Sequence, residues 1–60
     1  MVKVGSLVGV IQSFYDMNFT IVHKNDTGIV VASTSNSIRA FVRGKFVNGR
    51  CEFFKLLKSV

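Results

Sequence analysis

Six cationic side chains in the last third of the chain could bind a polyanion, and four aromatic rings lie among them. Residues 39–60 carry a surplus of five positive charges, whereas the charges of residues 1–38 balance. The cations are Arg39, Arg43, Lys45, Arg50, Lys55 and Lys58, against the single acid Glu52. The rings are Phe41, Phe46, Phe53 and Phe54. Cations neutralise phosphates and flat rings stack on exposed bases, so this pattern favours a surface that binds nucleic acid.

The dipeptide Asn48-Gly49 predicts the turn that positions these groups. A type I′ hairpin turn needs positive φ at both central residues, which Asn tolerates and Gly adopts freely. Pairing outward from this turn places Arg43 opposite Phe54 and predicts two faces. The core face holds Ala40, Val42, Gly44, Phe46, Cys51, Phe53 and Leu57, with Lys55 its only charge. The outer face holds Phe41, Arg43, Lys45, Val47, Arg50, Glu52, Phe54 and Leu56. In this register Gly44 lies within a strand, where glycine marks a bulge or a bend or leaves room for Phe53.

The outer face gives a set of candidate binding residues for single-stranded or structured DNA or RNA, with weak sequence preference. Phe41 and Phe54 would stack on bases, and the cations would contact phosphates. The candidates are Arg39, Phe41, Arg43, Lys45, Arg50, Phe54 and Lys58. Two other interpretations use the same residues. The face could dock on an acidic protein, as an inhibitor or interaction module, or the rings could pack on a neighbouring strand or subunit while Lys45 pairs with Glu52.

The remaining reactive side chains do not form a recognised catalytic or metal-binding pattern. The single histidine, His23, and the single cysteine, Cys51, are dispersed among three acids without metal-ligand spacing. We therefore expect no metal, no cofactor and no enzymatic activity. His23 is predicted to be a surface residue or a strand residue with its hydrogen bonds satisfied, and Cys51 is predicted to be a small buried thiol.

Four turn clusters separate segments rich in Val, Ile, Phe and Thr, which predicts an all-β fold. We expect a five-stranded antiparallel meander or a small barrel. The clusters are Asp16-Met17-Asn18, Asn25-Asp26-Thr27-Gly28, Ser35-Asn36-Ser37 and Asn48-Gly49. The second cluster predicts a hairpin between residues 19–24 and 29–34, closed by Gly28 in the left-handed region.

Residues 6–15 also fit a helix, because Leu7, Val10, Ile11, Phe14 and Tyr15 recur at helical spacing. Gly9 and three β-branched residues favour a strand instead. The alternative fold is therefore α+β, with a helix over residues 6–15 packed on a sheet. Residues 52–58 present the same choice between strand and helix.

Sixty residues form a single domain, residues 1–60, with a small core. The composition is 48% hydrophobic and 18% charged, so we expect self-association, with a dimer favoured. A lone cysteine cannot form an internal disulfide, and the longest apolar run is far too short to span a bilayer. These features predict a cytoplasmic protein whose partner is nucleic acid or an acidic protein surface, and not a membrane.

Overall fold

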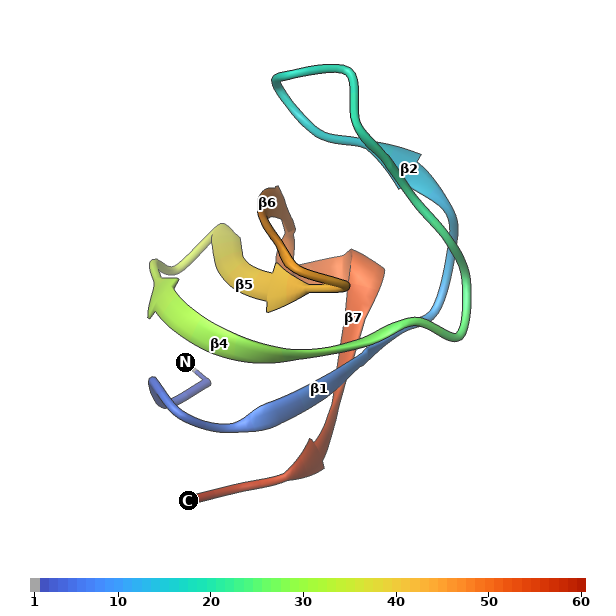
Figure 1. Ribbon diagram of the computed structural model, residues 1–60. Helices are drawn as coiled ribbons and strands as arrows, with labels where there is room; N and C mark the ends of the chain where they lie inside the picture. The colour runs from blue at the N-terminus through green and yellow to red at the C-terminus, as the bar shows by residue number, and fades with distance from the viewer. Residues whose placement is uncertain (1) are drawn as a thin grey trace.

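The computed structural model describes residues 2–60 as seven strands and one short 3-10 helix (Figure 1). The elements are β1 (Leu7–Val10), β2 (Phe14–Tyr15), β3 (Ile21–Val22), β4 (Thr27–Ser33), β5 (Ser37–Val42), β6 (Lys45–Arg50), η1 (Cys51–Phe53) and β7 (Phe54–Lys58). The all-β prediction is confirmed. The alternative helix over residues 6–15 is wrong, since this segment forms β1 and β2. Residues 52–58 begin in the turn of η1 and continue as strand β7.

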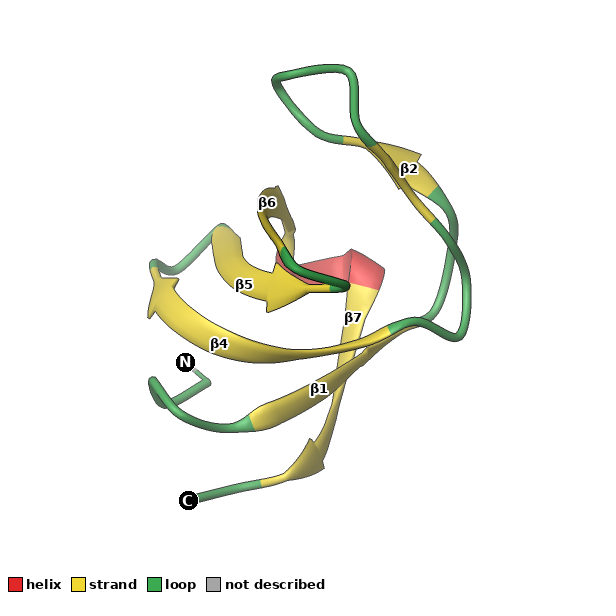
Figure 2. Ribbon diagram, in the orientation of Figure 1, coloured by secondary structure: helices red, strands yellow, loops and turns green. Residues whose placement is uncertain are grey.

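Five strands form one antiparallel sheet in the order β6-β5-β4-β1-β7 (Figure 2). The strands β4, β5 and β6 are a meander of consecutive neighbours, whereas β1 lies between β4 and β7. The sheet curls so that its two edge strands approach each other. A Cβ atom on Gly49 of β6 would lie 3.0 Å from the ring of Phe54 on β7.

The curled sheet encloses one small apolar core. Buried and exposed side chains alternate along β5, where Ile38, Ala40 and Val42 point inward. This period of two is what a strand with one buried face requires. The buried hydrophobic residues are Val8, Val10, Phe14, Val22, Val30, Ile38, Ala40, Val42, Val47 and Phe54.

The turn between β5 and β6 lies at Arg43-Gly44, and the predicted turn at Asn48-Gly49 is wrong. Arg43 and Gly44 have φ values of 52° and 80°, and Val42 pairs with Lys45 across them. A two-residue loop with positive φ at both positions is the type I′ geometry. Asn48 and Gly49 lie inside β6 instead, where Gly49 pairs with Ile38. The shift replaces the predicted pairing and places Gly44 in the turn rather than in a strand.

Gly44→Val should lower the free energy of unfolding by about 1–2 kcal/mol, because a side chain disfavours positive φ. A Cβ atom at this position would meet nothing within 4 Å, so the loss reports backbone conformation alone. Gly44→Asn should cost less, since Asn tolerates the left-handed region. Urea unfolding followed by circular dichroism measures both variants. Equal losses would contradict a type I′ turn at this position.

The hairpin predicted between residues 19–24 and 29–34 is also wrong. The chain does turn near Asn25, whose φ is 75°, but β3 pairs with β2 and β4 pairs with β1. Val10 donates its N–H to the carbonyl oxygen of Asp26, and its own carbonyl accepts the N–H of Asn25. These bonds join the segment after the turn to β1. Gly28 lies buried within β4 and not in the left-handed region.

The two remaining turn clusters are confirmed. Residues 17 and 18 lie in the turn between β2 and β3, and residues 35 and 36 in the bend between β4 and β5. The hydroxyl oxygen of Thr34 accepts the N–H groups of Asn36 and Ser37 in this second connection.

A two-stranded ribbon, which we call the β2–β3 arm (residues 14–22), extends over one end of the curled sheet (Figure 1). Its Phe14 and Val22 are directly opposed and both reach the core. The arm is therefore anchored on its inner side. None of the described residues belongs to a helix long and apolar enough to cross a membrane.

Candidate functional site

The outer side of the β5–β6 hairpin gathers exposed aromatic rings. Phe41 on β5 lies directly opposite Phe46 on β6, and the two ring centroids are 5.0 Å apart at an interplanar angle of 60°. Phe41 is 42% exposed and Phe46 is 52% exposed. Ile29 on β4 lies opposite Phe41 and is also exposed, so the apolar row crosses three strands.

Arg39 completes this surface. It lies on the outer side of β5, and its guanidinium carbon is 5.3 Å from the centroid of the Phe46 ring. A guanidinium over an aromatic face is an attractive cation–π contact. The side chains Ile29, Arg39, Phe41 and Phe46 thus form one continuous surface, which we call the β5–β6 outer face.

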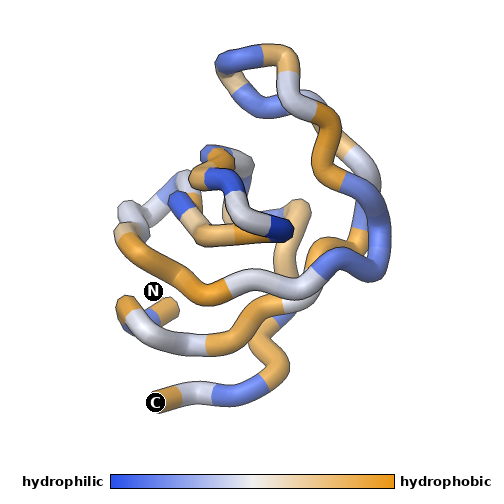
Figure 3. The backbone as a smooth tube through the Cα atoms, viewed as in Figure 1, coloured by the Kyte–Doolittle hydropathy of each residue, from blue (hydrophilic) through white to orange (hydrophobic). Residues whose placement is uncertain are grey.

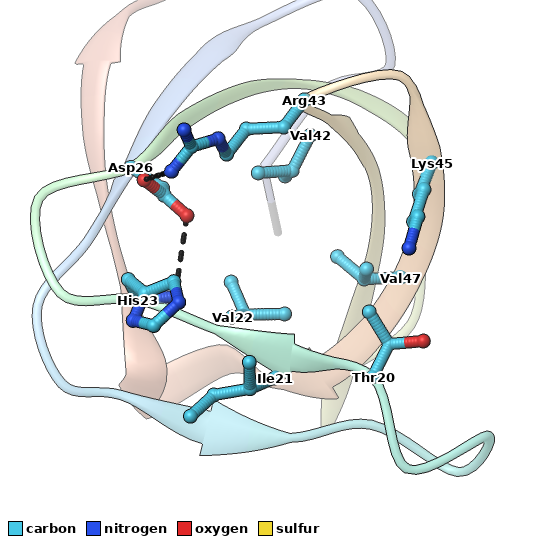
Figure 4. A pocket seen from close by; sticks show the side chains of 9 residues that line it. All are labelled: Thr20, Ile21, Val22, His23, Asp26, Val42, Arg43, Lys45 and Val47. Carbon is cyan, nitrogen blue, oxygen red and sulfur yellow. Dashed lines mark hydrogen bonds and ion pairs between the residues drawn. The ribbon is translucent and has the colours of Figure 1, made fainter.

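Two further predicted cations lie at the turn that ends this hairpin. Arg43 is in the turn itself, and Lys45 is the first residue of β6, opposite the inward-facing Val42. Both line an open cavity of about 340 Å³ between the turn and the β2–β3 arm (Figure 4). The other lining residues are Thr20, Ile21, Val22, His23, Asp26, Val42 and Val47.

The cavity rim contains an ion pair. An Nη of Arg43 lies 3.4 Å from a carboxylate oxygen of Asp26, and the other oxygen of Asp26 accepts the backbone N–H of His23. The Arg43 side chain is 70% exposed. The Asp26 side chain is only 13% exposed, but the Arg43 guanidinium faces solvent and remains accessible to a ligand. No ion pair between Lys45 and Glu52 occurs among the described residues.

Arg50 and Lys58 do not join this group. Arg50 ends β6, at the opposite end of that strand from the turn, and lines a separate depression with Ser35, Asn36 and Glu52. Lys58 ends β7 and pairs with Leu7, at the far edge of the sheet from β6. Of the predicted set, Arg39 and Phe41 lie on the β5–β6 outer face, whereas Arg43 and Lys45 line the cavity at the turn of the same hairpin.

Phe54 was predicted to be an exposed stacking ring, and this prediction is wrong. The side chain is 7% exposed and belongs to the core, where its ring packs against the edge of Phe14 at 5.6 Å between centroids. Val47 was also predicted on the outer face and is buried at 1% exposure. Both errors follow from counting pairs outward from Asn48-Gly49 instead of Arg43-Gly44.

The same shift explains why Phe46 was missed. It was assigned to the core face, yet it is the more exposed ring of the outer pair. A signal was available in the sequence, because Gly44 suits the second position of a type I′ turn. Counting outward from Arg43-Gly44 places Phe46 opposite Phe41 and Val47 opposite Ala40, as in the structure.

His23 and Cys51 occupy unremarkable surroundings. His23 is exposed beside the cavity, and Cys51 is half-buried, with its Sγ 3.8 Å from the carbonyl oxygen of Thr34. Within residues 2–60 no group of three or more His, Cys, Asp or Glu side chains is arranged to hold a metal ion.

Comparison with protein-family models, with curated proteins and with solved structures found no match.

Proposed function

We propose that this chain is a small nucleic-acid-binding domain that binds single-stranded or structured DNA or RNA, with weak sequence preference, through the β5–β6 outer face. The observation that carries the proposal is the exposed pair Phe41 and Phe46 with the guanidinium of Arg39 beside it. Aromatic rings on a strand face accept bases of any sequence, because every base has a flat π-face.

Cations at two places along the hairpin can contact the phosphates that accompany stacked bases. Arg39 lies next to the rings, and Arg43 and Lys45 lie at the turn at the end of the same two strands. The guanidinium of Arg39 is planar and stacks on rings as well as pairing with phosphate. A nucleic-acid strand that crosses the outer face toward the turn would meet the rings beside Arg39 first and Arg43 next, with Lys45 on the cavity side of the same turn.

Phe46→Leu should weaken binding of a labelled single-stranded oligonucleotide by about 1–3 kcal/mol, since leucine keeps the apolar surface but loses the stacking face. Arg39→Gln should instead reduce the slope of log affinity against log salt by about 0.7, because one phosphate contact is lost. Fluorescence anisotropy titrations over a series of salt concentrations measure both effects.

Lys58→Gln is the matched control, because it removes a cation at the far edge of the sheet. It should leave the salt slope closer to wild type than Arg39→Gln does. An affinity that does not change with salt would refute the proposal. Wild-type affinity in Phe46→Leu would remove the rings from the site.

An acidic protein surface is the second candidate partner. The row of Ile29, Phe41 and Phe46 is apolar and continuous across three strands, as the centre of a protein interface requires. Here Phe46→Leu should have little effect, because leucine conserves the apolar contact, whereas Ile29→Asp should abolish binding. A nucleic-acid ligand predicts the reverse order of these two effects.

A further inference from the structure

The cavity between the β5–β6 turn and the β2–β3 arm lies at an open end of the curled sheet. Its floor is apolar, because the core residues Val22, Val42 and Val47 line it and are only 2%, 4% and 1% exposed. Figure 4 shows these three side chains pointing toward the middle of the cavity. The chain segments beside it, the β5–β6 turn and the loop after β3, are hydrophilic (Figure 3). An apolar floor with a few polar groups, in the mouth of a barrel-like sheet, is typical of a ligand site.

Lys45 is a cation that the fold directs into this cavity. It lies opposite the inward-facing Val42 and two residues before the buried Val47. Its side chain therefore leaves β6 on the inner side of the sheet. Among residues 2–60 the only ion pair joins Arg43 to Asp26, so Lys45 has no carboxylate partner there. An ammonium that lines an apolar cavity without a partner in the protein indicates an anionic ligand.

Arg43 is a second cation at the rim. One Nη contacts Asp26, and the other N–H groups of the guanidinium remain free to donate to a ligand. The two oxygens of Asp26 are occupied, one by Arg43 and the other by the backbone N–H of His23. Of the Lys, Arg, Asp and Glu residues that line the cavity, two are cations and one is an acid. This surplus of positive charge raises the local concentration of anions.

The size and lining of the cavity indicate a nucleotide. Its volume of about 340 Å³ is near the lower limit of ligand pockets, which measure about 300–1,000 Å³, so it suits one small ligand. The floor requires an apolar body and the cations require an anionic group, and a nucleotide has both. Thr20, His23 and Asp26 at the rim offer donors and acceptors, and the edge of a base presents both kinds of group.

The charge of the phosphate favours a terminal group over one inside a strand. A phosphomonoester carries a charge of about −1.5 to −2 at pH 7, whereas each internal phosphate of a strand carries a single negative charge. Two cations at one cavity therefore attract a terminal phosphate more strongly.

We propose that the cavity binds a nucleoside monophosphate group, with the base on the valine floor and the phosphate on Lys45. The group is either a free nucleotide or the phosphorylated end of a nucleic-acid strand. The choice of a nucleotide over other organic phosphates rests on the proposed function. The site itself is separate from the β5–β6 outer face, since no residue of that face lines the cavity.

Titration with adenosine 5′-monophosphate tests the free nucleotide. In two-dimensional NMR spectra of the labelled protein, the amide signals of residues 20–23 and 42–47 should shift in a saturable way. Lys45→Gln should raise the dissociation constant about tenfold, the loss expected for one charge-assisted hydrogen bond, and should leave the melting temperature unchanged. Lys58→Gln is the matched control, because it removes a lysine at the far edge of the sheet. It should leave the dissociation constant unchanged.

Oligonucleotides with and without a terminal phosphate test the strand end. In fluorescence anisotropy competition at constant salt, the phosphorylated strand should bind more tightly, and this gain should disappear in Lys45→Gln. Phe46→Leu should weaken both strands equally and keep the gain, because Phe46 does not line the cavity. A gain without binding of free nucleotide would assign the site to strand ends, and the reverse would assign it to free nucleotides. Either result supports the site.

The proposal is overturned if neither the nucleotide nor a terminal phosphate is bound through Lys45. It is also overturned if inorganic phosphate or benzoate binds as tightly as the nucleotide, or if Lys58→Gln costs as much as Lys45→Gln. Strand binding that depends on Phe46 without any of these effects would leave the proposed function standing and remove only this site. Nucleotide binding through Lys45 in a protein that binds no strand would support this site and refute the proposed function.

Discussion

Phe54→Ala should lower the free energy of unfolding by about 3–5 kcal/mol, the usual loss when a buried phenylalanine is truncated. Phe54 is 7% exposed and packs on Phe14, so truncation leaves a cavity between β7 and the base of the arm. A domain of this size has about 3–9 kcal/mol of stability in total. The variant should therefore lose a large share of the stability of the domain, which urea titration followed by circular dichroism measures directly.

Phe46→Ala is the comparison for this prediction, because Phe46 is 52% exposed on the opposite side of the sheet. It should cost only about 1 kcal/mol, from the lost contacts with Phe41 and Arg39. The two phenylalanines therefore separate stability from binding: Phe54 supports the fold, and Phe46 is proposed to bind ligand. Equal losses of stability in both variants would contradict the register of β6.

Gly28→Val should lower the free energy of unfolding by about 3 kcal/mol through overpacking. A Cβ atom at Gly28 would lie 2.5 Å from a methyl carbon of Val42 and 2.8 Å from the backbone oxygen of Phe41. The backbone oxygen cannot move without disturbing the pairing of β4 with β5. Thermal unfolding followed by circular dichroism measures the loss.

Gly28→Asn distinguishes close packing from turn geometry. If Gly28 closed a turn in the left-handed region, Asn would be tolerated. In the structure Gly28 pairs with Val8 and with Val42 in the middle of the sheet, so Asn should destabilise about as much as Val. Near-wild-type stability of Gly28→Asn would contradict the position of Gly28 within β4.

Local signals predicted the class of the fold but not its long-range pairing. The β-branched segments predicted strands, and the polar clusters near residues 17 and 35 predicted turns, because both depend on neighbouring residues alone. The position of β1 between β4 and β7 depends on contacts between segments far apart in the sequence. The residue pattern of β1, residues 7–10, does not indicate that β4 and β7 are its neighbouring strands.

Asn48-Gly49 illustrates how packing overrides a local preference. A Cβ atom at Gly49 would lie 2.6 Å from the ring of Phe14, so glycine is needed there to admit that ring. An Asn-Gly dipeptide therefore suits a turn, and it equally suits a strand in which glycine leaves room for a neighbouring ring. The turn forms earlier in the chain, before β6, at Arg43-Gly44, where both residues take positive φ.

The candidate site was predicted only in part, because local sequence signals do not determine the register of the strands. Composition alone located the cations and rings in residues 39–60, whereas their distribution between the two faces required the register. Arg39 and Phe41 precede the turn, so the side of the sheet assigned to them does not depend on where the turn lies. Phe46 and Phe54 follow the turn, and each was assigned to the wrong side of the sheet.

The place of β1 in the sheet also bears on how the chain folds. The meander of β4, β5 and β6 needs only short loops to close and can form early. β1 must then join β4, and β7 must return across nearly the whole chain to pair with β1. Closing so long a loop comes late and is slow, as in other small β-proteins with high contact order that fold in about milliseconds to seconds. Any form of the chain in which β7 has not paired leaves one edge of β1 without its hydrogen-bonding partner, and an unpaired strand edge can pair with another chain.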